Sequence, residues 1–88
     1  MRLDKFLKVS RIIKRRTVAN TVSEMGRVFV NGSQAKPAKQ LKAGDILEIE
    51  YANRTEKYEI LIIPERNVSI QEAEKLYRII EEKDKKNA

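Results

Sequence analysis

The 88-residue sequence contains no cysteine and no histidine, and only three glycines and two prolines. Without cysteine there is no disulfide framework and no thiolate metal site. Without histidine the chain lacks the commonest general base and the commonest zinc ligand. No apolar run approaches the ~20 residues of a membrane span, and the N-terminus lacks the apolar region of a signal peptide. We therefore expect a cytoplasmic protein with no metal site, no cofactor and no membrane partner.

A chain of 88 residues makes one small domain, which buries roughly 60–65% of the surface that the unfolded chain exposes. That is enough for one thin core but too little for a deep substrate cleft. Asp4 and Asp45 are the carboxylates best placed for acid–base chemistry, yet they fit a helix start near the positive dipole end and a turn. We therefore expect that the chain is not an enzyme and has no small-molecule substrate.

Charge is distributed unequally along the chain. Residues 1–44 hold eleven Lys and Arg against two acids, a net charge of +9, whereas residues 45–88 hold eight against eleven, a net charge of −3. Such an asymmetry is typical of a chain with one half that faces a polyanion.

Basic residues are densest in the first sixteen positions. Seven cations stand there against a single acid, Asp4: Arg2, Lys5, Lys8, Arg11, Lys14, Arg15 and Arg16. Leu3, Phe6 and Leu7 recur at spacings of three and four, which predicts a short helix with one buried side. Arg2, Lys5 and Lys8 then lie on the adjoining flank, and residues 14–16 form a basic elbow after the helix.

A second helix is predicted from about residue 16 to residue 25. Val18, Val22 and Met25 have helical spacing, and Gly26 stands where a left-handed C-terminal cap belongs. The basic elbow therefore joins two short helices.

Strands are predicted in the middle of the chain. The period changes to two at residues 27–32, with Val28 and Val30 on one face and Phe29 on the other, and Asn31-Gly32 signals a tight hairpin. Pro37 keeps the return strand short. Residues 46–51 alternate between apolar and acidic, and residues 56–63 form another alternating strand that becomes wholly apolar before it stops at Pro64.

The C-terminal segment carries a helix signal. Ser69 and Glu72 fit a capping box, and Ala73, Leu76, Tyr77 and Ile80 follow at helical spacing. We expect a C-terminal helix, followed by a charged stretch from residue 81 to residue 88 that frays.

Motifs spread over most of the chain resemble the S-four (S4) RNA-binding domain. They are residues 2–7 (Arg-Leu-Asp-Lys-Phe-Leu), Arg15-Arg16 before Ala19, Gly26-Arg27-Val28, Val30-Asn31-Gly32, and Leu41 with Gly44-Asp45. The resemblance implies an α+β class with the αL RNA-binding fold, in which two short N-terminal helices pack on a small, mainly antiparallel sheet, plus a C-terminal helix. It also implies an S4 domain over residues 1–63 and a helical extension over residues 64–88. Arg15 departs from the pattern, because many S4 domains place a serine or threonine cap there.

Within that family, the run from Lys8 to Thr17 and the C-terminal Arg66, Ala73, Leu76 and Tyr77 are similar to stand-alone ribosome-associated members. These are the heat-shock fifteen-kilodalton group and its Gram-positive relatives, the RqcP family. The resemblance implies a protein that binds large ribosomal subunits carrying peptidyl-tRNA after a stalled ribosome splits, with contacts to rRNA and tRNA. It further implies cooperation with the tailing factor RqcH in adding alanine to nascent chains. We also expect the chain to be a monomer.

The candidate RNA-binding residues are mainly cations. Arginine grips phosphate oxygens with a planar fork, lysine acts as a point charge, and a helix start near residue 16 adds backbone N–H groups. Arg2 and Arg16 are the leading candidates. The full set is Arg2, Lys5, Lys8, Arg11, Lys14, Arg15, Arg16, Thr17, Arg27, Asn31 and Lys36. Turn geometry alone also explains Asn31.

Other functions fit parts of the pattern. A structural ribosomal protein, or a general rRNA-binding chaperone without stall specificity, would carry the same basic surface. A basic helix lying on anionic lipid is a third alternative. The first predicted helix is short and lacks a broad apolar face, which disfavours lipid binding.

Overall fold

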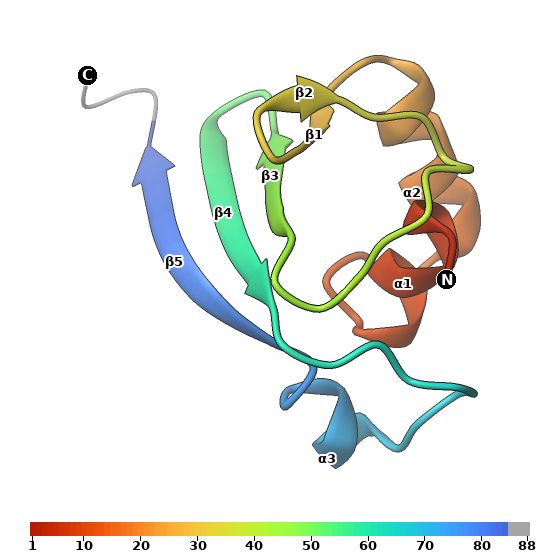
Figure 1. The fold of residues 1–88 in the computed structure, drawn as a ribbon. Helices are drawn as coiled ribbons and strands as arrows, with labels where there is room; N and C mark the ends of the chain where they lie inside the picture. The colour runs from red at the N-terminus through yellow and green to blue at the C-terminus, as the bar shows by residue number, and fades with distance from the viewer. Residues whose placement is uncertain (85–88) are drawn as a thin grey trace.

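The computed structural model describes residues 1–84. Helices and strands are arranged in the order that the α+β prediction requires, with two helices first and a sheet after them (Figure 1). The helices are α1 (Leu3–Val9), α2 (Arg16–Glu24) and α3 (Ile70–Ala73), and the strands are β1 (Val28–Val30), β2 (Ser33–Gln34), β3 (Ile46–Glu50), β4 (Arg54–Ile60) and β5 (Tyr77–Asp84). In this part of the chain no helix combines the length and apolar character that a membrane crossing needs.

The five strands form one antiparallel sheet in the order β2-β1-β3-β4-β5. The Asn31-Gly32 hairpin that joins β1 to β2 is confirmed, with φ of 53° and 85° at its two central residues. Both values lie in the left-handed region that a tight primed turn requires. The two-residue β2 confirms that the return strand is short.

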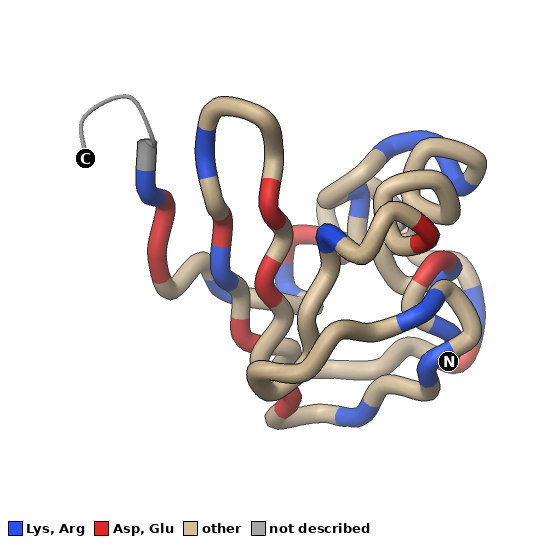
Figure 2. The backbone as a smooth tube through the Cα atoms, turned by 90° about the horizontal axis from the view of Figure 1, so that it is seen from above, with Lys and Arg blue, Asp and Glu red and all other residues tan. Residues whose placement is uncertain are grey.

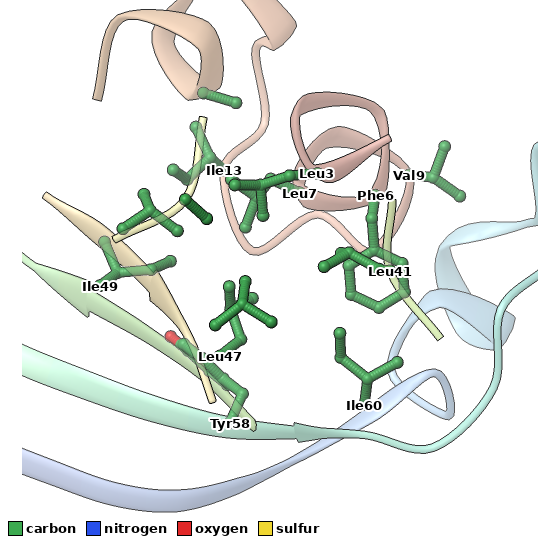
Figure 3. Packing of buried hydrophobic residues seen from close by; sticks show 14 of the residues in the cluster. Leu3, Phe6, Leu7, Val9, Ile13, Leu41, Leu47, Ile49, Tyr58 and Ile60 are labelled. Atoms are coloured by element: carbon green, nitrogen blue, oxygen red, sulfur yellow. The ribbon is translucent and has the colours of Figure 1, made fainter. Parts of the chain in front are cut away.

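Helices α1 and α2 cover one face of this sheet (Figure 1). Leu3, Phe6 and Leu7 of α1 are fully buried, and they pack with Leu47 and Ile60 of the sheet in one core (Figure 3). Burying a large apolar side chain stabilises the fold by about 1.5–3 kcal/mol. The predicted buried side of the first helix is therefore confirmed, and α1 is fixed to the sheet by three anchors.

Backbone hydrogen bonds fix the start of α1. The N–H groups of Leu3 and Asp4 donate to the carbonyls of Lys39 (2.8 Å) and Pro37 (3.1 Å), and the N–H of Leu41 donates to the carbonyl of Met1 (2.9 Å). The first N–H groups of a helix have no partner within the helix. The connection between β2 and β3 therefore supplies the partners that α1 needs and holds its first turn in place.

The second helix confirms its predicted start and its cap. It begins at Arg16, ends at Glu24, and is followed by Gly26 with φ of 74°. Arg15 occupies the N-cap position and, within the described chain, makes no side-chain capping hydrogen bond. The departure from a serine or threonine at this position therefore leaves α2 without a side-chain cap at its start.

The prediction for the fourth strand is wrong at both ends. β4 runs from Arg54 to Ile60, whereas a strand was expected over residues 56–63. The N–H groups of Leu61 and Ile62 both point to the carbonyl of Leu76, at 2.8 and 3.2 Å, instead of continuing the ladder. The strand starts earlier because residues of β3 and β5 pair with Arg54 and Thr55, directly after the turn between β3 and β4.

The predicted C-terminal helix is wrong beyond its first turn. Ser69 caps α3 as expected, since its hydroxyl accepts a hydrogen bond from the N–H of Glu72 at 3.2 Å. The helix ends at Ala73, and the chain then forms β5, whose residues pair with β4. Residues 81–84 lie in this strand instead of fraying, and residues 85–88 lie outside the described residues.

Tertiary pairing explains this error. Without β5, the outer edge of the seven-residue β4 would expose unpaired backbone groups, a state that folded sheets avoid. Tyr77 also packs edge-to-face on Tyr58, with ring centroids 5.4 Å apart. Leu76, which the helical spacing predicted to be one of the apolar positions, is buried between α3 and β5 in the sequence. Of the helical extension predicted over residues 64–88, the described part thus contains only the four-residue helix α3, followed by the eight-residue strand β5 of the same sheet.

Replacing Phe6 by alanine tests whether α1 is held by its apolar side. The ring is fully buried, so we expect the free energy of unfolding to fall by about 3–5 kcal/mol, as measured by urea denaturation. Val18→Ala on α2 is the control, because Val18 is 45% exposed and should change the value by less than about 0.5 kcal/mol. Equal effects of the two substitutions would contradict this packing.

Candidate RNA-binding surface

Two arginines from different elements share one buried carboxylate. Arg2 Nε lies 3.2 Å from Asp4 Oδ1, and Arg16 Nε lies 3.5 Å from Asp4 Oδ2. The Asp4 side chain is only 3% exposed, whereas the two arginine side chains are 45% and 48% exposed. The carboxylate thus holds both guanidinium groups from below while nearly half of each arginine side chain faces solvent.

Asp4 also joins the two helices. Asn20 of α2 donates its amide to Asp4 Oδ2 (3.4 Å), and the N–H of Lys5 donates to Oδ1 (2.8 Å). Burial alone would raise the pKa of Asp4, but these hydrogen bonds and the charges of Arg16 and Arg2 outweigh burial and lower the pKa. The carboxylate is therefore ionised at neutral pH and acts as a charged clamp between α1 and α2.

A shallow hollow opens around this clamp at the start of α2. Residues of both helices line it: Arg2, Asp4, Arg16, Thr17, Asn20 and Thr21. The two leading candidate arginines and two threonines are thus among its lining residues. Asp4, Asn20 and Thr21 are the members that sequence reasoning missed as site residues, although Asn20 lies one helical turn from Arg16, on the same side of α2.

The end of α1 and the segment after it form a second basic hollow, lined by Lys8, Arg11 and Lys14 together with Val9, Asn67 and Val68. Arg11 adopts φ of 63°, a left-handed conformation that costs a residue with a Cβ atom roughly 1–2 kcal/mol. The surrounding bonds impose this conformation: the N–H of Arg11 donates to the carbonyl of Lys8 (3.0 Å), and that of Ile13 to the carbonyl of Leu7 (3.0 Å). An arginine thus occupies a position that suits glycine.

The remaining candidates are more dispersed. Lys5 lines a third hollow beside Arg2, and Arg15 is exposed directly before α2. Arg27 precedes β1, and Lys36 follows β2 on the connection to β3. Figure 2 shows basic segments gathered on the side of the helices, and acidic and basic segments interspersed along the strands.

Asn31 has a structural role in the hairpin. Its amide nitrogen donates to Asp45 Oδ1 (3.1 Å), and its oxygen accepts from the N–H of Ile46 (2.9 Å). Both ends of the side chain are therefore engaged within the protein, and the turn explanation accounts for this residue. Its RNA contact stays a prediction.

The family model of the S4 domain matches residues 1–47, which include α1, α2, the β1–β2 hairpin and the start of β3. The chain therefore belongs to the class of S4 domain proteins.

Individual relatives match this chain over nearly its whole length. The RQC P-site tRNA stabilizing factor of Listeria monocytogenes is 51% identical over 84 residues, which are 93% of this chain and 88% of the relative. That of Bacillus subtilis is 42% identical over 82 residues, 93% of this chain and 94% of the relative. The trimeric structure of Vibrio cholerae heat shock protein 15 superposes with a TM-score of 0.80 at 33% identity, over 90% of this chain and 80% of that one. The chain belongs to the family of RQC P-site tRNA stabilizing factors.

Asp4→Asn tests the charged clamp through pH. The pKa of Asp4 is lowered from its ordinary value of 3.8, so its stabilisation is complete above that value and is lost as pH falls through the lowered pKa. We expect the variant to lose about 1–2 kcal/mol of unfolding free energy near pH 7, since both arginines are half exposed and screened. Urea denaturation near pH 2 should show a smaller difference in unfolding free energy between the variant and the parent chain. A difference that does not change with pH would contradict the role of Asp4 as a charged clamp.

Proposed function

We propose that this chain is an RNA-binding factor of ribosome-associated quality control. It binds large ribosomal subunits that carry peptidyl-tRNA, touches rRNA and tRNA, and supports alanine tailing of the nascent chain with RqcH. It acts as a cytoplasmic, ribosome-associated monomer through the predicted domain of residues 1–63. The names of its relatives support the pathway, because P-site tRNA stabilising factors at 42–51% identity cover 93% of the chain.

The observation that carries the RNA contact is the pair of arginines held on Asp4. Structured RNA is contacted mainly through phosphates, 2′-hydroxyls and shape, because its major groove is too narrow for side chains to read. Arg2 and Arg16 are fixed about one carboxylate and remain half exposed. Fixed guanidinium groups lose less conformational entropy on meeting a phosphate than free ones do.

The same groups argue for binding without catalysis. Asp4 is engaged by two arginines and Asn20. Asp45 accepts hydrogen bonds from the amide of Asn31 and the N–H of Lys42. The two buried aspartates are thus committed to holding the fold, and the sequence has no histidine or cysteine to take the role of base or nucleophile.

Sucrose-gradient sedimentation of the tagged chain from cells tests the function. A quality-control factor should concentrate on free large subunits that carry peptidyl-tRNA, whereas a structural ribosomal protein would follow translating ribosomes. Arg16→Ala should weaken binding to purified large subunits about tenfold, the value of one charge-assisted hydrogen bond.

Arg78→Ala provides the matched control. Arg78 is also exposed and also pairs with one carboxylate, Glu59, at 2.6 Å, but it lies on β5. Its replacement should leave the gradient profile unchanged. Co-sedimentation with translating ribosomes, or equal loss in both variants, would contradict the proposal.

Arg11 allows the fold and the RNA contact to be separated. Arg11→Gly removes a cation and relieves the left-handed strain, so its melting temperature should equal or exceed that of the parent chain. Arg11→Ala removes the same cation but keeps the strain. Both variants should bind rRNA more weakly and lower the slope of log affinity against log salt by about one, as measured by filter binding. Unchanged affinity in the glycine variant would show that Arg11 lies outside the interface.

A further inference from the structure

The turn between β3 and β4 carries an arginine stacked on an aromatic ring. The guanidinium carbon of Arg54 lies 4.5 Å from the centroid of the Tyr51 ring. The N–H of Tyr51 donates to the carbonyl of Arg54 at 2.8 Å, which closes the turn. The two stacked side chains, Tyr51 and Arg54, form a stacking platform.

A buried carboxylate fixes this platform. Arg54 Nε lies 2.6 Å from Glu56 Oε2, and the hydroxyl of Tyr58 donates to the other oxygen of Glu56. Glu56 is only 8% exposed, whereas the Arg54 side chain is 47% exposed. One face of the guanidinium covers Tyr51 while nearly half of the side chain meets solvent. The plane of the group is thus held by its neighbours before any ligand arrives.

The platform lies on the sheet face that the helices cover. Along β3, Leu47 and Ile49 point into the core, and Tyr51 continues their alternation and packs against the same cluster. Along β4, Arg54 and Glu56 share the inward side with Tyr58. Glu48 and Glu50 alternate to the other face. Because nearly half of the Arg54 side chain is exposed, a ligand at this end of the sheet can reach the platform.

We propose that the Tyr51–Arg54 platform binds an unpaired RNA base by stacking, which rests on the proposed function. Sequence-specific and single-stranded RNA contacts commonly use aromatic rings or guanidinium planes as stacking surfaces. The charge of Arg54 is already compensated by Glu56 at 2.6 Å, and Glu82 lies opposite Glu56 in the strand register. This environment favours a neutral base on the exposed plane over a phosphate, which the helical cations attract instead.

Two synthetic RNAs test the platform: a hairpin with 2-aminopurine in its single-stranded loop, and a blunt duplex of the same length. Arg54→Ala should lower affinity for the loop RNA about tenfold, abolish the stacking-dependent quenching of 2-aminopurine, and leave duplex binding unchanged. Arg54→Lys keeps the charge and a partner for Glu56 but lacks the plane, so it should fail like the alanine variant. Thermal denaturation confirms that each variant is folded at the assay temperature.

Arg78→Ala is the matched control, since Arg78 pairs with Glu59 at the same 2.6 Å but is not part of the stack on Tyr51. Its loop affinity and quenching should equal those of the parent chain. The stacking proposal is wrong, while the proposed function stands, in either of two cases. In the first, Arg54→Lys keeps the loop affinity and the quenching of the parent chain. In the second, the parent chain binds the loop RNA and Arg54→Ala binds it equally well. If the parent chain binds neither RNA, the proposed function falls together with the platform.

Discussion

A helix of seven residues does not persist in water, and the position of each cation on α1 depends on what holds that helix. Isolated helices shorter than about 12–15 residues are marginal even with favourable sequences, and α1 and α2 have seven and nine. Apolar burial of Leu3, Phe6 and Leu7, with backbone bonds from the connection before β3, supplies the missing stability. A mobile cationic peptide becomes a rigid basic surface by this packing.

Asp4 places a negative charge within that basic surface, where it holds two arginines in position. Arg2 and Arg16 come from different elements, and their like charges repel by about 1 kcal/mol or less in water. Asp4 offsets this repulsion and joins both arginines to Asn20. The group of three keeps a net positive charge, so the clamp reduces the local field only in part while it fixes the geometry.

The parts of the fold that follow from short-range signals were predictable. Gly26 and Asn31-Gly32 require left-handed backbone and adopt it, and the apolar spacing of α1 identified its buried side. The C-terminal helix was not predictable in this way, because Leu76 and Tyr77 fit an inward position in a helix or a strand. The segment forms a strand because it pairs with the edge of β4, and β4 lies outside the local sequence pattern. In the site, single cations could be proposed from the sequence, whereas the Asp4–Asn20 link joins residues sixteen positions apart.

The acidic half of the chain raises a difficulty for RNA binding that ion pairs on the sheet reduce. A net charge of −3 over residues 45–88 would repel phosphate if its carboxylates were free and close to the helices. Lys57 pairs with Glu48 at 3.6 Å and Arg78 with Glu59 at 2.6 Å. Exposed pairs of this kind add about 0–1 kcal/mol to stability, so their main effect is on the field. The pairs leave the net charge of −3 unchanged, but each paired carboxylate has a cation beside it, so its own field weakens within a Debye length of about 8 Å. The net charge of +9 over residues 1–44 therefore remains the larger influence on an approaching RNA.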